Sequence, residues 1–129
     1  MRCPTNTMPI TLVAGDHGTP LLFTIRDSSR AAPGRVLDPR NPDTWMPYDL
    51  TRVAAIHVPI RPVDRSQPPR TLTAVKLSPF GLGFFQMVWE QDLFATPGRY
   101  EGEVRLEYAD GAVETVYLRL LFVVRESLQ

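Results

Sequence analysis

Residues 99–108 alternate strictly between two kinds of side chain, and this pattern constrains the fold more than any other feature of the chain. One set comprises Tyr100, Gly102, Val104, Leu106 and Tyr108, and the other comprises Arg99, Glu101, Glu103, Arg105 and Glu107. Because successive side chains of a strand point to opposite faces, the pattern predicts a half-buried antiparallel strand. Asp110 and Gly111 then favour a tight hairpin turn, with residues 112–125 as the returning strand.

Strand patterns recur along the rest of the chain, whereas helix patterns are nearly absent. The other expected strands span residues 9–13, 21–26, 52–62, 71–78 and 84–89. Turn residues separate the strands at spacings of about 8–12 residues, which is typical of a β-sandwich. The sequence therefore predicts an all-β chain, an antiparallel immunoglobulin-like β-sandwich of about seven strands. The term describes architecture only, because the Cys…Trp…Cys signature of antibody domains is absent.

Proline is concentrated in the middle of the sequence. Nine of the thirteen prolines lie between residues 33 and 79. Proline has no backbone N–H and breaks helices, so this region is expected to hold loops and edge strands. Residues 27–48 are predicted to form a long proline-rich loop insertion. Pro59 and Pro62 indicate that the strand over residues 52–62 lies at an edge or carries a bulge.

Length and composition fit one globular domain. A chain of 129 residues with 43% hydrophobic residues can bury a core. We expect a flexible N-terminal arm at residues 1–8 and a single sandwich domain over residues 9–129. No basic region followed by a long apolar run is present, and the most apolar tract, near residues 118–124, is too short to span a bilayer. We therefore expect no membrane association and no export across a membrane.

The charges balance over the whole chain but not within it. Fourteen basic residues match fourteen acidic ones, which argues against nucleic-acid binding through bulk positive charge. Residues 1–76 carry ten basic and six acidic side chains, a balance of +4, and residues 77–129 carry four and eight, a balance of −4. The two parts either interleave without consequence or give the surface faces of opposite charge that suit binding to unlike neighbours.

Residue patterns for catalysis or for a cofactor are missing from the sequence. It has no phosphate-binding glycine loop and no nucleophile elbow, and Cys3 is the only cysteine. His17 and His57 are not part of any closely spaced ligand set, so no metal site is expected. The glutamates of residues 99–108 alternate with arginines along the chain, which favours a cross-strand-paired surface over acid–base catalysis. We therefore expect neither enzyme activity nor a cofactor.

Aromatic residues are the remaining candidates for a binding surface. Trp45, with Met46 and Tyr48 beside it, either folds back as a plug over the sandwich or anchors a partner. Phe80, Phe84 and Trp89 could form a platform for a sugar. However, the alternation through residues 85, 87 and 89 places at least one face of that segment in the core.

The order of several motifs resembles a known family. The chain opens with Ile10-Thr11-Leu12-Val13-Ala14-Gly15-Asp16 and continues with Leu21-Leu22-Phe23-Thr24-Ile25, Asp49-Leu50-Thr51, Trp89, Asp92-Leu93, Thr96-Pro97-Gly98-Arg99-Tyr100-Glu101-Gly102-Glu103-Val104, Tyr108-Ala109-Asp110-Gly111 and Phe122-Val123-Val124. Over residues 9–125 it resembles the immunoglobulin-like N-terminal domain of tailed-phage baseplate upper proteins and related small phage virion proteins. The segment 27–48 is longer and richer in proline than that family leads us to expect.

The resemblance implies a structural virion protein rather than an enzyme. It would be an adaptor or accessory subunit of the tail or baseplate, made in the host cytoplasm and present in several symmetric copies. Since no receptor-binding head is expected beyond Gln129, an adaptor is favoured over an adhesin. The alternatives are a capsid decoration protein, a head–tail neck or collar protein and, more distantly, a carbohydrate-binding module.

Within this interpretation, other phage structural proteins are the expected partners. The loop 27–48 and the terminal residues 1–8 are the candidate contacts, because flexible segments can become ordered on binding. The predicted partner-binding residues are the apolar anchors Trp45, Met46 and Tyr48 and the polar contacts Arg30, Arg35 and Arg40.

Overall fold

The computed structural model describes residues 10–116 and 119–128, which form an all-β fold. Its strands are β1 (Ile10–Val13), β2 (Leu21–Thr24), β3 (Arg26–Ala31), β4 (Trp45–Pro47), β5 (Val53–Pro62), β6 (Arg70–Lys76), β7 (Phe84–Met87), β8 (Gly98–Gly102), β9 (Arg105–Tyr108), β10 (Val113–Thr115) and β11 (Leu120–Arg125), with short 3-10 turns η2 (Pro42–Thr44) and η3 (Phe80–Leu82). All seven expected strand regions contain strand, so the predicted β-sandwich is confirmed. The expected terminal arm, residues 1–8, lies outside the described residues.

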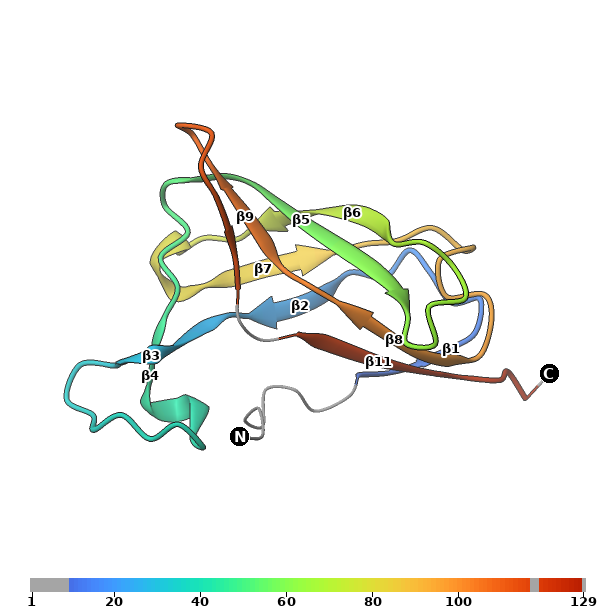
Figure 1. The fold of residues 1–129 in the computed structure, drawn as a ribbon, viewed down its shortest axis with the longest axis horizontal. Coiled ribbons are helices and arrows are strands. Elements are labelled where there is room, and N and C mark those ends of the chain that lie inside the picture. Colours follow the sequence, from blue (N-terminus) through green and yellow to red (C-terminus); the bar gives the residue numbers. More distant parts are fainter. Residues whose placement is uncertain (1–9, 117–118, 129) are drawn as a thin grey trace.

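Nine of the described strands form one sheet that curls into two layers (Figure 1). Its order is β1-β11-β8-β5-β6-β7-β2, and β9 lies between β5 and β10. Strand β6 pairs with β5 along most of its length but with β7 only at Val75 and Lys76. The sheet therefore turns at the end of β6, which brings β7 and β2 to face β5, β8 and β11. The described pairs are antiparallel except for β1 with β11.

The core lies between these layers and follows the predicted alternation. Every second residue from Tyr100 to Leu106 is buried, and the intervening charged residues face outward. Strand β5 contributes Ile56, Val58 and Ile60 in the same way. Phe94 is fully buried although it lies in the turn between β7 and β8, where no periodic pattern could mark it.

Of the two alternatives expected for residues 52–62, an edge strand or a bulged strand, the edge strand is wrong. Strand β5 pairs with β6 on one side and with β8 and β9 on the other, so it is central. Pro59 lies opposite Glu103, where the carbonyl of Pro59 accepts the Glu103 amide at 3.1 Å. Pro59 has no N–H to return that bond, and the partner strand is divided into β8 and β9 at this point. The strand does carry an irregularity, but the register with β9 shifts between Val53 and Ala55 and not at the prolines.

Segment 27–48 is also more regular than the predicted loop. Strands β3 and β4 form their own two-stranded sheet, with a register irregularity between Asp27 and Ala31. We call β3, η2, β4 and their connections, residues 26–47, the arm. Figure 1 shows the arm standing out at one end of the sandwich, with the loops that follow β5 and β7 at the opposite end. The sequence did not indicate β3 because its residues are mostly polar and do not alternate.

Gly83 directly precedes β7 and joins this strand to Ile25 at the base of the arm. Replacing Gly83 with alanine tests this junction. Its φ is +75°, and its carbonyl accepts the Ile25 amide at 2.9 Å. An added Cβ would collide with the carbonyl oxygen of Ile25 and approach that of Tyr48. We expect Gly83→Ala to lower the free energy of unfolding by about 2–3 kcal/mol, measured by urea denaturation.

Two matched variants separate the causes of that loss. Gly81→Ala has open space and no positive φ, so we expect it to leave stability unchanged or slightly raised. Gly15→Ala has a φ of +86° but open space, so it isolates the conformational cost, about 1 kcal/mol. Equal losses for Gly83→Ala and Gly15→Ala would contradict the predicted collision.

Candidate functional site

The connection between β3 and η2, residues 32–41, is the tip of the arm. Hydrogen bonds within the arm hold this tip in one conformation. The Thr44 hydroxyl donates to the Asn41 carbonyl at 2.7 Å and accepts the Asp38 amide at 3.0 Å. The Ala32 amide donates to the Thr44 carbonyl at 2.8 Å, and the indole N–H of Trp45 donates to the Asp38 carbonyl at 2.9 Å. The arm therefore presents a prearranged surface, which lowers the entropic cost of binding.

Trp45 is a buried residue of the arm. Its side chain is fully buried. It is also not among the described residues of the hydrophobic cluster that fills the sandwich. Neither expected role is shown: Trp45 does not belong to the cluster of the sandwich that it was expected to cover, and its indole is not exposed, so its role in partner binding stays a prediction. A lone aromatic residue in a proline-rich segment has no periodic neighbours, so the sequence could not decide between the roles.

Met46 and Tyr48 are both half-buried and lie at the base of the arm. The Tyr48 amide donates to the Ile25 carbonyl at 3.1 Å, and its hydroxyl donates to Glu114 at 3.3 Å. The Tyr108 hydroxyl donates to the other carboxylate oxygen of Glu114 at 2.7 Å. Partial burial and the Glu114 charge raise the pKa of Tyr48 above its ordinary value and that of Tyr108 to about 12. Both phenols stay protonated at neutral pH, and the Tyr48 hydroxyl joins the segment that follows β4 to Glu114 of the β9–β10 hairpin.

Arg30, Arg35 and Arg40 are exposed on the arm, as a contact role requires. No ion pair joins any of the three to another described residue. The Arg40 amide donates to the Asp38 carboxylate at 2.9 Å, which fixes the backbone near the tip. These three guanidinium groups remain available, and their predicted role in partner binding stays a prediction.

The charged face of residues 99–108 is paired across strands, as the sequence predicted. Glu101 accepts hydrogen bonds from Arg61 at 2.8 Å and from Arg119 at 2.9 Å. Glu107 lies 2.9 Å from the His57 imidazole. The hydrogen bond from Arg61 outweighs partial burial and holds the pKa of the Glu101 carboxyl below its ordinary value. This face is a network of ion pairs that stabilises the folded state.

The ion pairs of Glu101 predict a loss of stability in acid. A depressed folded-state pKa stabilises the protein above the unfolded-state value of about 4.3, and this contribution is lost as pH falls through the folded-state pKa. We expect Glu101→Gln to cost about 1 kcal/mol at pH 7, since both arginines are partly solvated. It should also flatten the decline in unfolding free energy between pH 5 and 3, measured by urea denaturation.

Glu103→Gln is the matched control for this experiment. Glu103 is more exposed, and its carboxylate lies 3.7 Å from Arg105, which is a weak surface contact. We expect its unfolding free energy and its acid profile to match those of the unmodified protein. A Glu101→Gln variant with an unchanged acid profile would contradict the role assigned to this pair of arginines.

Of the three residues expected to form a sugar platform, Trp89 is buried, Phe84 is half-buried and Phe80 is partly exposed. Trp89 is 5% exposed, and its indole N–H donates to the Asp16 carbonyl at 3.0 Å. The Phe80 ring lies under the Lys76 ammonium, 4.3 Å from it. Phe85 and Met87 are buried with Trp89, which confirms the core prediction for that face.

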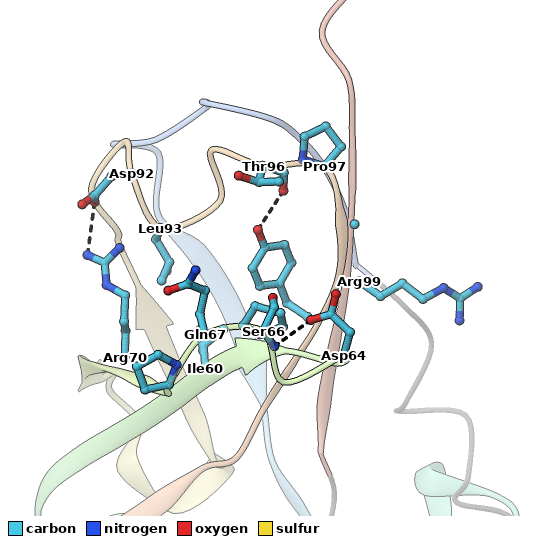
Figure 2. A pocket seen from close by; sticks show the side chains of 14 residues that line it. Ile60, Asp64, Ser66, Gln67, Arg70, Asp92, Leu93, Thr96, Pro97 and Arg99 are labelled. Carbon is cyan, nitrogen blue, oxygen red and sulfur yellow. Dashed lines mark hydrogen bonds and ion pairs between the residues drawn. The ribbon is translucent and has the colours of Figure 1, made fainter.

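A pocket that the sequence did not indicate lies between the loops at the far end from the arm (Figure 2). Its volume is about 360 Å³, and we call it the loop pocket. Its lining residues are Ile60, Pro62, Asp64, Ser66, Gln67, Pro68, Arg70, Asp92, Leu93, Thr96, Pro97, Gly98, Arg99 and Tyr100. They come from two stretches, 60–70 and 92–100, that only the folded topology brings together.

Apolar and polar side chains share the lining of the loop pocket. Asp92 accepts a hydrogen bond from Arg70 at 3.1 Å, and the Tyr100 hydroxyl donates to the Thr96 carbonyl at 2.7 Å. In Figure 2 the Gln67 side chain lies between these two pairs. Among the described residues, no group of three His, Cys, Asp or Glu side chains is placed to hold a metal. The pocket therefore offers apolar contacts beside hydrogen-bonding groups.

In the part of the chain that the structure describes, no helix is long and apolar enough to cross a membrane.

The sequence was also compared with protein-family models and with curated proteins. No family model and no curated protein matches this sequence.

Proposed function

We propose that this chain is a non-enzymatic structural protein of a tailed-phage virion. In this proposal it is an adaptor or accessory subunit of the tail or baseplate that docks onto neighbouring subunits of the particle. The motif order over residues 9–125 supports the proposal through its resemblance to baseplate upper proteins. A β-sandwich that binds through an element projecting from a rigid scaffold is consistent with this role.

The observation that carries the proposal is the arm. A buried tryptophan and a set of internal hydrogen bonds hold an element that stands out from the sandwich (Figure 1). This construction is costly for a simple connection between β2 and β5 and suits a contact surface. Arg30, Arg35 and Arg40 supply long, charged side chains of the type enriched in interfaces.

Mass spectrometry of density-banded phage particles from the source tests the proposal directly. A few to tens of copies per particle, scaled to the major capsid protein, would support a tail, baseplate or neck position. Hundreds of copies would place the protein on the capsid shell and favour the decoration alternative. Absence from purified particles would overturn the virion proposal.

Removing the three arginines of the arm should weaken docking without unfolding the protein. We expect the combined change of Arg30, Arg35 and Arg40 to alanine to lower incorporation into particles about tenfold. Because all three side chains are exposed, stability should change by less than about 1 kcal/mol. Incorporation is measured by complementing a deletion phage and quantifying the protein in banded particles.

The control removes the same charge elsewhere. Arg52, Arg105 and Arg125 are exposed and lie outside the arm. Changing these three to alanine should leave incorporation close to that of the unmodified protein. Equal losses for the two triple variants would mean that overall charge, and not the arm, controls docking.

A further inference from the structure

Val36 is an exposed apolar side chain on the tip of the arm. It is 88% exposed, whereas Trp45 and Thr44 beneath the tip are buried. Arg35 precedes it and is also exposed. An exposed apolar side chain next to a free guanidinium is suited to a pocket that offers both apolar contacts and a carboxylate.

The loop pocket of the same chain has these properties. Leu93, Pro97 and Tyr100 form part of its apolar lining. Its volume of about 360 Å³ greatly exceeds the ~30 Å³ of one water molecule, so it has room for an aliphatic side chain with adjoining backbone.

One carboxylate of the pocket lining, that of Asp64, is complementary to Arg35 of the arm. Asp92 is already paired with Arg70, and the Arg99 side chain points away from the pocket in Figure 2. Asp64 has no ion-pair partner among the described residues. Hydrogen bonds from Ser66 hold the pKa of the Asp64 carboxyl below its ordinary value, so this carboxylate is ionised at neutral pH. An arginine from outside would find an unpaired anion there.

The arm and the loop pocket lie at opposite ends of the molecule (Figure 1), so the tip cannot enter the pocket of its own chain. We propose that the arm tip of one copy inserts Val36 into the loop pocket of a second copy and places Arg35 beside Asp64. The contact is head to tail, and such contacts generate rings or open filaments. The inference rests on the proposed function in one respect, because it names a second copy as a docking partner of the arm.

A contact of this size is weak in isolation. The tip and the pocket bury less surface than a stable interface of about 1,600 Å². Simultaneous contacts around a ring or on a particle would raise the effective affinity. Pairing in solution is therefore best trapped by a covalent crosslink.

Cysteine crosslinking tests the head-to-tail geometry. In a Cys3→Ser background, Val36→Cys and Gln67→Cys each introduce one thiol, at the tip and in the pocket. Under mild oxidation we expect disulfide-linked dimers in the mixture of the two variants, at least about tenfold above either variant alone. Dimers of Val36→Cys alone at the level of the mixture would indicate a tip-to-tip contact and overturn the proposal, as would no crosslink in the mixture.

Two further variants measure the association itself. Val36→Asp should lower the self-association constant at least about tenfold in sedimentation equilibrium, because an ionised carboxylate would lose the apolar contacts of Val36 and enter a pocket that Asp64 and Asp92 line. Arg52→Asp, an exposed change outside the arm, is the control and should leave it unchanged. A protein that stays monomeric throughout, and does not crosslink, overturns this inference but leaves the proposed virion role to be decided by particle composition.

Discussion

Replacing Phe94 with alanine is expected to lower the free energy of unfolding by about 3–5 kcal/mol. The Phe94 ring is fully buried and lies 5.0–5.2 Å from the rings of Trp89, Tyr100 and Phe122, measured between centroids. Its contacts with Trp89 and Tyr100 are edge-on, a geometry that adds about 0.5–1.5 kcal/mol per pair to the burial of area. The change would remove the centre of this aromatic cluster and leave a cavity.

The loss is a large fraction of the stability of a domain of this size, about 5–15 kcal/mol. We expect the midpoint of thermal unfolding to fall by about 10–20 °C. Urea denaturation followed by tryptophan fluorescence measures the free energy, and Trp89 reports directly because it contacts Phe94. The same cavity also loosens the turn that carries Leu93 and borders the loop pocket.

Phe80→Ala is the matched control. Phe80 is 37% exposed, and its ring contacts the Lys76 ammonium at the surface. Losing that contact costs about 0.5–1 kcal/mol, well below the effect at Phe94. If the two variants lost similar stability, the aromatic cluster would not be the centre of the core.

Phe94 also marks the limit of what the sequence predicts about this fold. Alternation identified the buried faces of β5, β8 and β9, because a strand repeats its environment every two residues. Phe94 lies in a turn, where no repeat of the sequence marks a buried position. Its burial depends on packing against residues of other strands. The same limit explains why the sequence allowed β5 to be an edge strand. A proline shows that one backbone N–H is missing, but it does not show whether another strand lies on the side where that N–H would point.

The sequence predicted some features of the candidate site and missed others for the same reason. Exposure of Arg30, Arg35 and Arg40 followed from their polarity and their place in a proline-rich segment. The burial of Trp45 and the existence of the loop pocket did not, because each depends on contacts between residues far apart in the sequence or in irregular backbone. Sequence patterns located the arm as the element of interest, and only the structure separated its buried tryptophan from its exposed residues.

Trp45→Ala is expected to release the arm while leaving the sandwich folded. Removing a fully buried tryptophan costs about 3–5 kcal/mol. This cost falls on the arm, because Trp45 does not belong to the cluster that fills the sandwich. A two-stranded sheet is marginal without such support, so the local stability of the arm is exhausted before the sandwich is affected.

Hydrogen exchange resolved by mass spectrometry distinguishes local from global loss. We expect the amides of residues 26–47 to lose protection in Trp45→Ala and those of β5 to keep it. The far-UV circular dichroism should remain close to that of the unmodified protein. Loss of protection in β5, with a matching fall in the thermal midpoint, would show instead that Trp45 supports the whole core.

Docking should fail together with the arm. Without Trp45, the Asp38 carbonyl loses its indole donor and the tip no longer holds Val36 and Arg35 in place. Incorporation into particles should fall at least as far as in the triple arginine variant, about tenfold or more, because binding must then also order the arm. Trp45→Phe keeps an aromatic ring in the site but loses the indole N–H and part of the buried volume, so it should recover part of both amide protection and incorporation. A disordered arm with unchanged incorporation would mean that the buried tryptophan serves the arm's structure alone and that the partner surface lies elsewhere on the sandwich.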